Sequence, residues 1–111
     1  MSSVTLLGEF EQIILLAILR LGDDAYGVTI REEIVVRTDR SPSPGALYTT
    51  LDRLEDKGLV KSRFGDPTPQ RGGRAKRYFH VTAKGVAAVA SAQRAYRRLL
   101  EGLTLPGVHH A

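Results

Sequence analysis

Residues 43–58, SPGALYTTLDRLEDKG, restrict the fold more than any other part of this chain. The leucines of this stretch recur at i, i+4 and i+7, which is the spacing of the buried stripe of an amphipathic helix. Ser43 is a favourable N-cap residue, Pro44 fits the first helical position, and Gly58 suits the position after the last turn. The stretch therefore predicts one helix whose two ends are both defined.

The remaining sequence predicts three more helices and one β-hairpin. The expected helices cover residues 6–21, 23–38 and 82–102, and the expected strands cover residues 59–64 and 76–81. Gly and Pro are dense between the two strands, as in a hairpin with a long tip. The order helix, helix, helix, hairpin, helix is that of a winged helix-turn-helix, in which the hairpin is the wing. The predicted fold class is mainly α with a small β-hairpin.

The chain is expected to form one compact unit with three functional segments. Residues 1–81 would form the winged helix-turn-helix DNA-binding domain, residues 82–103 a C-terminal dimerisation helix, and residues 104–111 a flexible tail. At 111 residues the chain is long enough for one hydrophobic core and too short for two domains of ordinary size. Its longest apolar run, residues 13–19, is far shorter than the roughly 20 residues that a membrane span needs. We therefore expect a cytoplasmic protein without a membrane partner.

The titratable residues form no recognisable catalytic or metal-binding pattern. His80 lies in a strand-like run beside aromatic residues, and His109 and His110 have no acidic or cysteine neighbours. The acidic pairs at 23–24 and 32–33 are explained by a helix start and a solvated helix face. The chain has no cysteine, which excludes disulfides and thiolate metal sites. We expect no metal ion, no cofactor and no enzymatic activity.

Charge is distributed unevenly along the chain. Residues 1–58 contain six Lys or Arg against ten Asp or Glu, a net charge of −4, and residues 59–111 contain ten against two, a net charge of +8. The two values sum to the overall +4. Such asymmetry favours a basic surface that binds phosphate groups, although solubility alone is a simpler explanation.

Opposite its leucines, the predicted helix at 44–57 has an uncharged N-terminal half. Gly45 and Thr49 face outward there, Tyr48 lies at the side, and acidic residues follow toward the C-terminal end. A recognition helix that enters the major groove by its N-terminal end needs this polarity, because carboxylates repel phosphates. Thr49 and Arg53 suit base or phosphate contacts, and Tyr48 suits a phosphate oxygen. Tyr48 as a core aromatic and Thr49 as an ordinary surface residue are equally compatible with the helix alone.

The stretch 71–77, RGGRAKR, carries four cations and no acid at the expected hairpin tip. A cationic tip beside a recognition helix can contact phosphates or insert an arginine into the minor groove. A solvated loop is the alternative. The position of the stretch, directly after a predicted helix-turn-helix, favours the wing.

The predicted last helix carries a regular apolar seam. Its positions alternate by four and three residues, namely Gly85, Val89, Ala92, Tyr96, Leu99 and Leu103. The seam either packs on its own chain or pairs with a second copy. We favour a homodimer, because one winged helix contacts few base pairs and two-fold symmetry supplies a second half-site. The predicted dimer interface comprises Phe10, Ile13, Val89, Ala92, Tyr96, Leu99 and Leu103.

These motifs resemble those of the PadR family of bacterial winged-helix transcriptional regulators. The resemblance extends over about residues 7–103 and is most specific in the run GALYTTLDRLEDKGL; LGEFEQIILLAIL, DDAYGVTI, RGGRAKRYF and VTAKG are also similar. The single last helix resembles the short subgroup of that family. The resemblance implies a homodimeric repressor that binds an inverted repeat in double-stranded DNA and is released by a small-molecule effector.

By motif position, the resemblance also assigns DNA contacts to individual residues. They are Tyr26, Ser43, Gly45, Tyr48, Thr49, Arg53, Arg71, Arg74 and Lys76. Two features depart from the family pattern: Pro42 replaces an expected apolar residue, and the absence of tryptophan argues against an effector site built on tryptophan stacking. A winged-helix module for protein–protein assembly, without DNA readout, is the alternative function.

Overall fold

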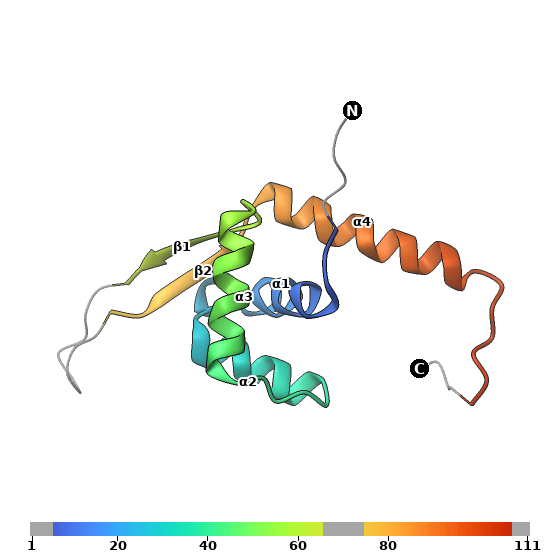
Figure 1. The fold of residues 1–111 in the computed structure, drawn as a ribbon, viewed down its shortest axis with the longest axis horizontal. Helices are drawn as coiled ribbons and strands as arrows, with labels where there is room; N and C mark the ends of the chain where they lie inside the picture. Colours follow the sequence, from blue (N-terminus) through green and yellow to red (C-terminus); the bar gives the residue numbers. More distant parts are fainter. Residues whose placement is uncertain (1–5, 66–74, 108–111) are drawn as a thin grey trace.

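The computed structural model describes residues 6–65 and 75–107. Its elements are α1 (Glu9–Leu21), the short 3-10 helix η1 (Gly22–Asp24), α2 (Gly27–Arg37), α3 (Pro44–Asp56), β1 (Val60–Phe64), β2 (Arg77–Val81) and α4 (Ala83–Leu100). Helices α1, α2 and α3 form a central body, the antiparallel hairpin β1–β2 extends from one side, and α4 runs away on the other (Figure 1). The predicted fold class is confirmed.

Helix α1 lies at the centre of the core, where it contacts α2, α3, α4 and β2. Its residues Ile14 and Leu15 have no exposed surface, and Ile18 is almost fully buried. Full burial of such a side chain stabilises the fold by about 1.5–3 kcal/mol. No helix within residues 6–65 and 75–107 is both long enough and apolar enough to cross a membrane.

Helix α3 forms as its sequence predicts. The Ser43 hydroxyl oxygen accepts a hydrogen bond of 3.1 Å from the amide of Ala46, and Pro44 occupies the first helical position. The three leucines of the stripe are at most 1% exposed; they are Leu47, Leu51 and Leu54. Gly58 follows the helix with a φ of 76°, a conformation that glycine adopts without steric cost. The opposite face of α3 is left to solvent.

Helix α2 begins later than its sequence predicts. Asp23 and Asp24 form the 3-10 turn instead of the N-cap, and Tyr26 occupies the cap position. The cause is the neighbouring strand: the amide of Phe79 donates to the carbonyl of Ala25 at 2.8 Å, and Tyr26 pairs with Tyr78 as an isolated bridge. This pairing holds the segment before α2 in an extended conformation. Helix α1 likewise begins at Glu9, three residues after the predicted start.

Helix α4 is buried only over its first turns. Thr82 caps it by accepting a hydrogen bond from the amide of Gly85, and Gly85 and Val89 are the buried residues of this helix. The structure therefore corrects the prediction that put Val89 in the dimer interface: Val89 is 6% exposed and lies in the core of its own chain. The reason is that the first turns of α4 pack against α1 and β2.

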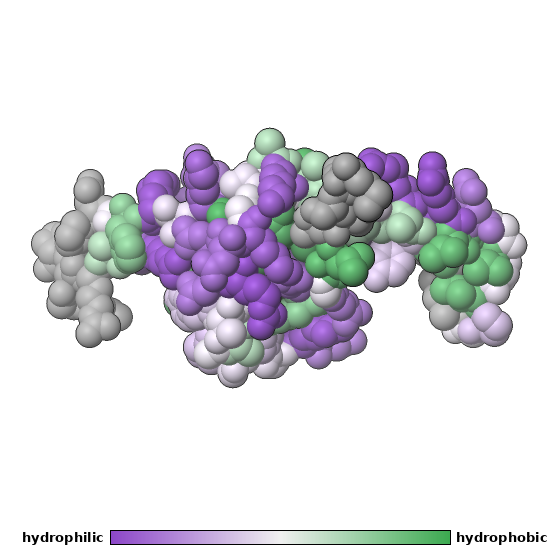
Figure 2. Space-filling model, turned by 45° about the horizontal axis from the view of Figure 1, so that its top comes forward, coloured by the Kyte–Doolittle hydropathy of each residue, from purple (hydrophilic) through white to green (hydrophobic). Residues whose placement is uncertain are grey.

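The C-terminal half of α4 and the segment after it carry exposed apolar side chains. Tyr96 is 51% exposed, Leu99 75% and Leu103 59%. A hydrophobic patch covers the end of the molecule where this segment lies (Figure 2, right). The hairpin and α4, which project on opposite sides, explain the radius of gyration of 16.1 Å, since a compact domain of this size has about 13 Å.

Candidate nucleic-acid interface

The exposed face of α3 has the polarity that the sequence predicts. Gly45, Thr49 and Arg53 are all exposed and follow one another along the helix at intervals of four residues. Around Gly45 no heavy atom outside the local backbone lies within 4 Å of the position that a β-carbon would occupy. The N-terminal half of this face is therefore open, small and uncharged.

Tyr48 joins α3 to the start of α2. A β-carbon on Gly27 would lie only 1.9 Å from the Tyr48 hydroxyl oxygen and 2.6 Å from its Cζ atom. The ring thus passes over the first residue of α2, and Tyr48 remains 41% exposed. Tyr48 is neither a core aromatic nor a detached surface residue. Its hydroxyl lies at the N-terminus of α2, where backbone amides favour an anion.

The turn between α2 and α3 is held by a side chain of α2. The Arg31 Nε atom donates a hydrogen bond of 2.7 Å to the carbonyl of Pro42. This contact fixes the residue directly before Ser43, and so it helps to position the first turn of α3. Pro42, which departs from the family pattern, is half-buried at this point.

Two of the three acidic residues of α3, Asp52 and Glu55, are bound by the wing. Arg77, the first residue of β2, donates from Nη1 to Asp52 at 3.1 Å, from Nη2 to Glu55, and from Nε to the hydroxyl of Ser62 at 3.2 Å. The Ser62 hydroxyl in turn donates to Glu55 at 2.8 Å. That hydrogen bond lowers the pKa of Glu55 despite the opposing effect of burial, and Arg77 lowers it further. Both carboxylates are paired with Arg77.

A cluster of aromatic and cationic side chains lies at the root of the wing. The rings of Tyr26 and Tyr78 meet edge to face, with centroids 5.4 Å apart. The Lys76 Nζ atom lies 4.4 Å from the centroid of Tyr26 and 3.3 Å from its hydroxyl oxygen, and the Arg63 guanidinium lies over Tyr78. The hydrogen bond with Tyr26 raises the pKa of Lys76, so that Lys76 is charged at neutral pH.

Comparison with known proteins agrees with this architecture. The sequence model of the transcriptional regulator PadR-like family matches residues 15–91, which cover α2, α3, the wing and about half of α1 and of α4. The chain belongs to the PadR-like family. Membership of this family supports a role in DNA-binding transcriptional regulation.

Individual relatives lead to the same family. The chain is 37% identical over 82 residues to an uncharacterized protein of Lysinibacillus sphaericus, covering 72% of this chain and 71% of that protein. It is 37% identical over 79 residues to the transcriptional regulator Rv3488 of Mycobacterium tuberculosis, covering 69% and 67%. Among solved structures, a PadR family transcription regulator of Clostridium difficile R20291 superposes with a TM-score of 0.68 at 25% identity, over 83% of this chain and 92% of that one.

Of the DNA contacts that the PadR resemblance assigns, the structure describes seven. Tyr26 and Lys76 meet at the root of the wing, and the other five belong to α3 or its N-cap: Ser43, Gly45, Tyr48, Thr49 and Arg53. Arg71 and Arg74 lie outside the described residues. Sequence analysis missed the positions that hold this surface together, namely Gly27, Arg31, Arg77 and Tyr78. Only Arg77 gave a signal, as one of the cations of RGGRAKR.

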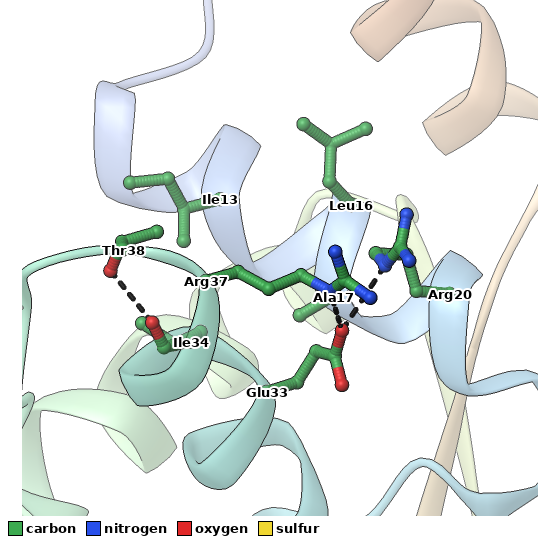
Figure 3. A pocket seen from close by; sticks show the side chains of 8 residues that line it. All are labelled: Ile13, Leu16, Ala17, Arg20, Glu33, Ile34, Arg37 and Thr38. Atoms are coloured by element: carbon green, nitrogen blue, oxygen red, sulfur yellow. Dashed lines mark hydrogen bonds and ion pairs between the residues drawn. The ribbon is translucent and has the colours of Figure 1, made fainter.

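A separate pocket in this PadR-family chain lies between α1 and α2 (Figure 3). Its volume is about 200 Å³, and Ile13, Leu16 and Ala17 of α1 form much of its apolar wall. At one end, Glu33 accepts hydrogen bonds from Arg20 and Arg37. An engineered apolar cavity of about 150 Å³ binds benzene, so that the pocket has room for a small apolar group.

Proposed function

We propose that the protein is a homodimeric, sequence-specific repressor that binds an inverted-repeat operator in double-stranded DNA and is released by a small-molecule effector. The observation that carries this proposal is the exposed face of α3. Its N-terminal half is open and uncharged, whereas two of the three carboxylates farther along, Asp52 and Glu55, are paired with Arg77 of the wing. The N-terminal half of this face can approach phosphates without repulsion from a carboxylate of its own.

We place the N-terminal half of α3 in the major groove. Gly45 permits close approach of the helix to the base edges, because nothing projects from it. Thr49, one turn farther on, can donate or accept a hydrogen bond at a base edge or contact a thymine methyl group. Arg53 follows after another turn and can reach guanine or a phosphate. These three residues would determine the preferred sequence.

A second group of residues would bind the phosphate backbone. Ser43 lies at the N-terminus of α3, and the hydroxyl of Tyr48 lies at the N-terminus of α2. Lys76 contributes a charged ammonium group, and its partner Tyr26 contributes a hydroxyl. Arg71 and Arg74 are proposed from the sequence as contacts of the wing tip. Phosphate contacts of this kind orient the protein but carry no sequence information.

The exposed apolar side chains of α4 support the proposed homodimer. Beside them, Leu7 and Gln12 help to line a groove of about 250 Å³ against Ala92, Tyr96 and Leu99 of α4. A second copy would cover this surface, which is too apolar to remain in water without cost. The proposed interface comprises Phe10, Ile13, Ala92, Tyr96, Leu99 and Leu103. A two-fold axis would then present two copies of α3 to two half-sites.

We place the effector in the pocket between α1 and α2. Its apolar wall suits a small hydrophobic group. Arg20 and Arg37 share the single carboxylate of Glu33, and the positive charge that remains suits a negatively charged substituent. Tyr48 of α3 lies against the start of α2, and Arg31 of α2 holds the linker before α3. A ligand that displaces α2 from α1 would therefore also displace α3. Binding of small hydrophobic anions should weaken the DNA complex, and Leu16→Gln should remove that response.

Fluorescence anisotropy with DNA from the promoter of the protein's own gene tests the proposal. We expect the protein to bind the promoter DNA more tightly than a scrambled duplex. The logarithm of the affinity should fall linearly with the logarithm of the salt concentration. Binding without sequence preference, or none at all, would contradict the proposal. If the protein then formed a stable complex with another protein that survived neutralisation of Arg71, Arg74 and Lys76, it would be an assembly module.

A further inference from the structure

Among the described cations of the wing, Arg77 has a guanidinium group that three hydrogen bonds hold within the protein. All three of its nitrogen atoms donate hydrogen bonds, to Asp52, Glu55 and Ser62. The same group lies over the ring of Phe79, with its central carbon 4.9 Å from the ring centroid. Phe79 is itself only 2% exposed. We propose that Arg77 is a positioning residue, which fixes the wing against α3 and does not bind DNA itself.

The position of Arg77 in the hairpin makes this contact effective. Arg77 pairs with Phe64 at the end of the paired strands that lies nearest the tip, whereas Val60 and Val81 pair at the opposite end. The core already holds Val60, which is 1% exposed. Without the Arg77 contacts, the outer part of the hairpin would lose its tie to α3, and the angle between wing and recognition helix would vary.

The hairpin is also held on its other face. Residues directly opposite each other in an antiparallel pair point to the same side, so that Phe64, Arg77, Ser62 and Phe79 share one face. Tyr78 points to the other face, where it contacts Tyr26. The wing is therefore held by α3 on one face and by the ring of Tyr26 on the other. Because both faces of the hairpin are in contact with the rest of the protein, the wing cations and α3 can bind one DNA site in a defined relative position.

The ion pairs have a second consequence, which concerns charge. Burial alone would lower the pKa of Arg77, but Asp52 and Glu55 outweigh that effect and raise it. The guanidinium is thus permanently charged and compensates part of the negative charge of the two carboxylates. Asp56 is exposed and pairs with none of the described residues, so it offers a carboxylate without this compensation on the same helix.

This inference rests on the proposed function, and its test compares two matched double variants. Asp52→Asn with Glu55→Gln neutralises the two carboxylate partners of Arg77 and so weakens its contacts with α3. Asp39→Asn with Asp56→Asn neutralises two exposed acids that pair with none of the described residues. Each raises the net charge by two. Coulombic attraction alone would make both variants bind DNA more tightly than the wild type.

If Arg77 positions the wing, only the Asp52/Glu55 variant should bind DNA more weakly than the wild type. We expect the Asp52/Glu55 variant to bind the operator about threefold to tenfold more weakly, as coupled contacts of this kind do when broken. The Asp39/Asp56 variant should bind equally well or more tightly. Thermal unfolding of each variant, with binding measured well below the midpoint, separates this effect from loss of the fold.

Arg77→Lys supplies a second measurement. Lysine keeps the charge and serves well as a phosphate contact, but it cannot bridge two carboxylates and a hydroxyl with a planar fork. We expect Arg77→Lys to weaken binding as much as the Asp52/Glu55 variant does. Unchanged binding by Arg77→Lys, or tighter binding by the Asp52/Glu55 variant, would overturn the inference. Absence of salt-dependent operator binding by the wild type would instead overturn the proposed function.

Discussion

The hydroxyl of Tyr48 lies directly over Gly27, at a place where a β-carbon would approach the oxygen to 1.9 Å. The first residue of α2 must therefore lack a side chain for the ring of α3 to pass. This contact sets the distance between the two helices of the helix-turn-helix. It also brings the Tyr48 hydroxyl to the N-terminus of α2, where we place a DNA phosphate.

We expect Gly27→Ala to lower the free energy of unfolding by about 1–3 kcal/mol, because the added methyl group forces the Tyr48 ring outward. Denaturation by urea measures this change. Gly45→Ala is the control: it has open space, and alanine is favoured over glycine in a helix by up to about 1 kcal/mol. If the penalty persists in a Tyr48→Ala background, the contact with Tyr48 is not its cause.

A buried ion pair predicts how stability depends on pH. Glu11 is 7% exposed and accepts from Lys57 at 2.7 Å and from the amide of Gly8 at 2.8 Å. Burial alone would raise the pKa of Glu11, but these hydrogen bonds outweigh it and lower the pKa below its ordinary 4.5. Since the folded state binds the proton less readily, the contribution of Glu11 is complete above about pH 4.5 and is lost as pH falls through its folded pKa.

We expect Glu11→Gln to lower the free energy of unfolding by about 1–3 kcal/mol at pH 7, because a charge-assisted hydrogen bond is lost. The difference from the wild type should shrink as the solution is acidified below the ordinary pKa of the carboxyl group. Urea titrations at neutral and acidic pH measure both effects. Glu9→Gln is the control, since its pair with Arg40 is exposed and should contribute less than about 1 kcal/mol.

The sequence predicted the elements of this fold because local signals define most of them. In α3, the N-cap, the apolar stripe and the terminal glycine all lie within one continuous stretch, and the structure reproduces each. The start of α2 was mispredicted because it depends on pairing between Ala25–Tyr26 and β2, about 50 residues away. Asp23 is a favourable N-cap residue, but the local sequence gives no sign of the strand pairing that displaces the start of the helix.

The candidate site likewise contains residues that the local sequence predicts and residues that only tertiary contacts reveal. Exposure of Gly45, Thr49 and Arg53 followed from helical periodicity alone. The pairing of Arg77 with α3 did not, because a cation in a basic stretch has the same local sequence whether it binds a phosphate or a carboxylate. Val89 belongs to the apolar seam of α4, as its spacing predicts. The spacing could not show that this part of the seam packs against its own chain, which depends on how α4 lies on the core.

Two substitutions should separate base readout from phosphate binding. We expect Thr49→Ala to change which operator sequences are preferred, because Thr49 is placed at the base edges. Arg74→Ala should weaken binding to all sequences similarly and reduce the salt slope by about one, as loss of one phosphate contact does. Anisotropy titrations with a set of operator variants at several salt concentrations distinguish the two. The opposite pattern would mean that the wing reads the bases and α3 contacts the backbone.

The exposed end of α4 predicts the effect of a charge on dimerisation. Leu99 is 75% exposed, and we expect Leu99→Glu to convert the dimer to a monomer, because a carboxylate cannot be buried in an apolar interface without a partner. Analytical ultracentrifugation should show half the mass, with affinity for a single half-site unchanged and affinity for the complete inverted repeat reduced at least tenfold, or about 1.4 kcal/mol. Val36→Glu is the control, since Val36 is 81% exposed on α2 and lies outside the proposed interface. Equal masses for the two variants would show that α4 does not form the dimer contact.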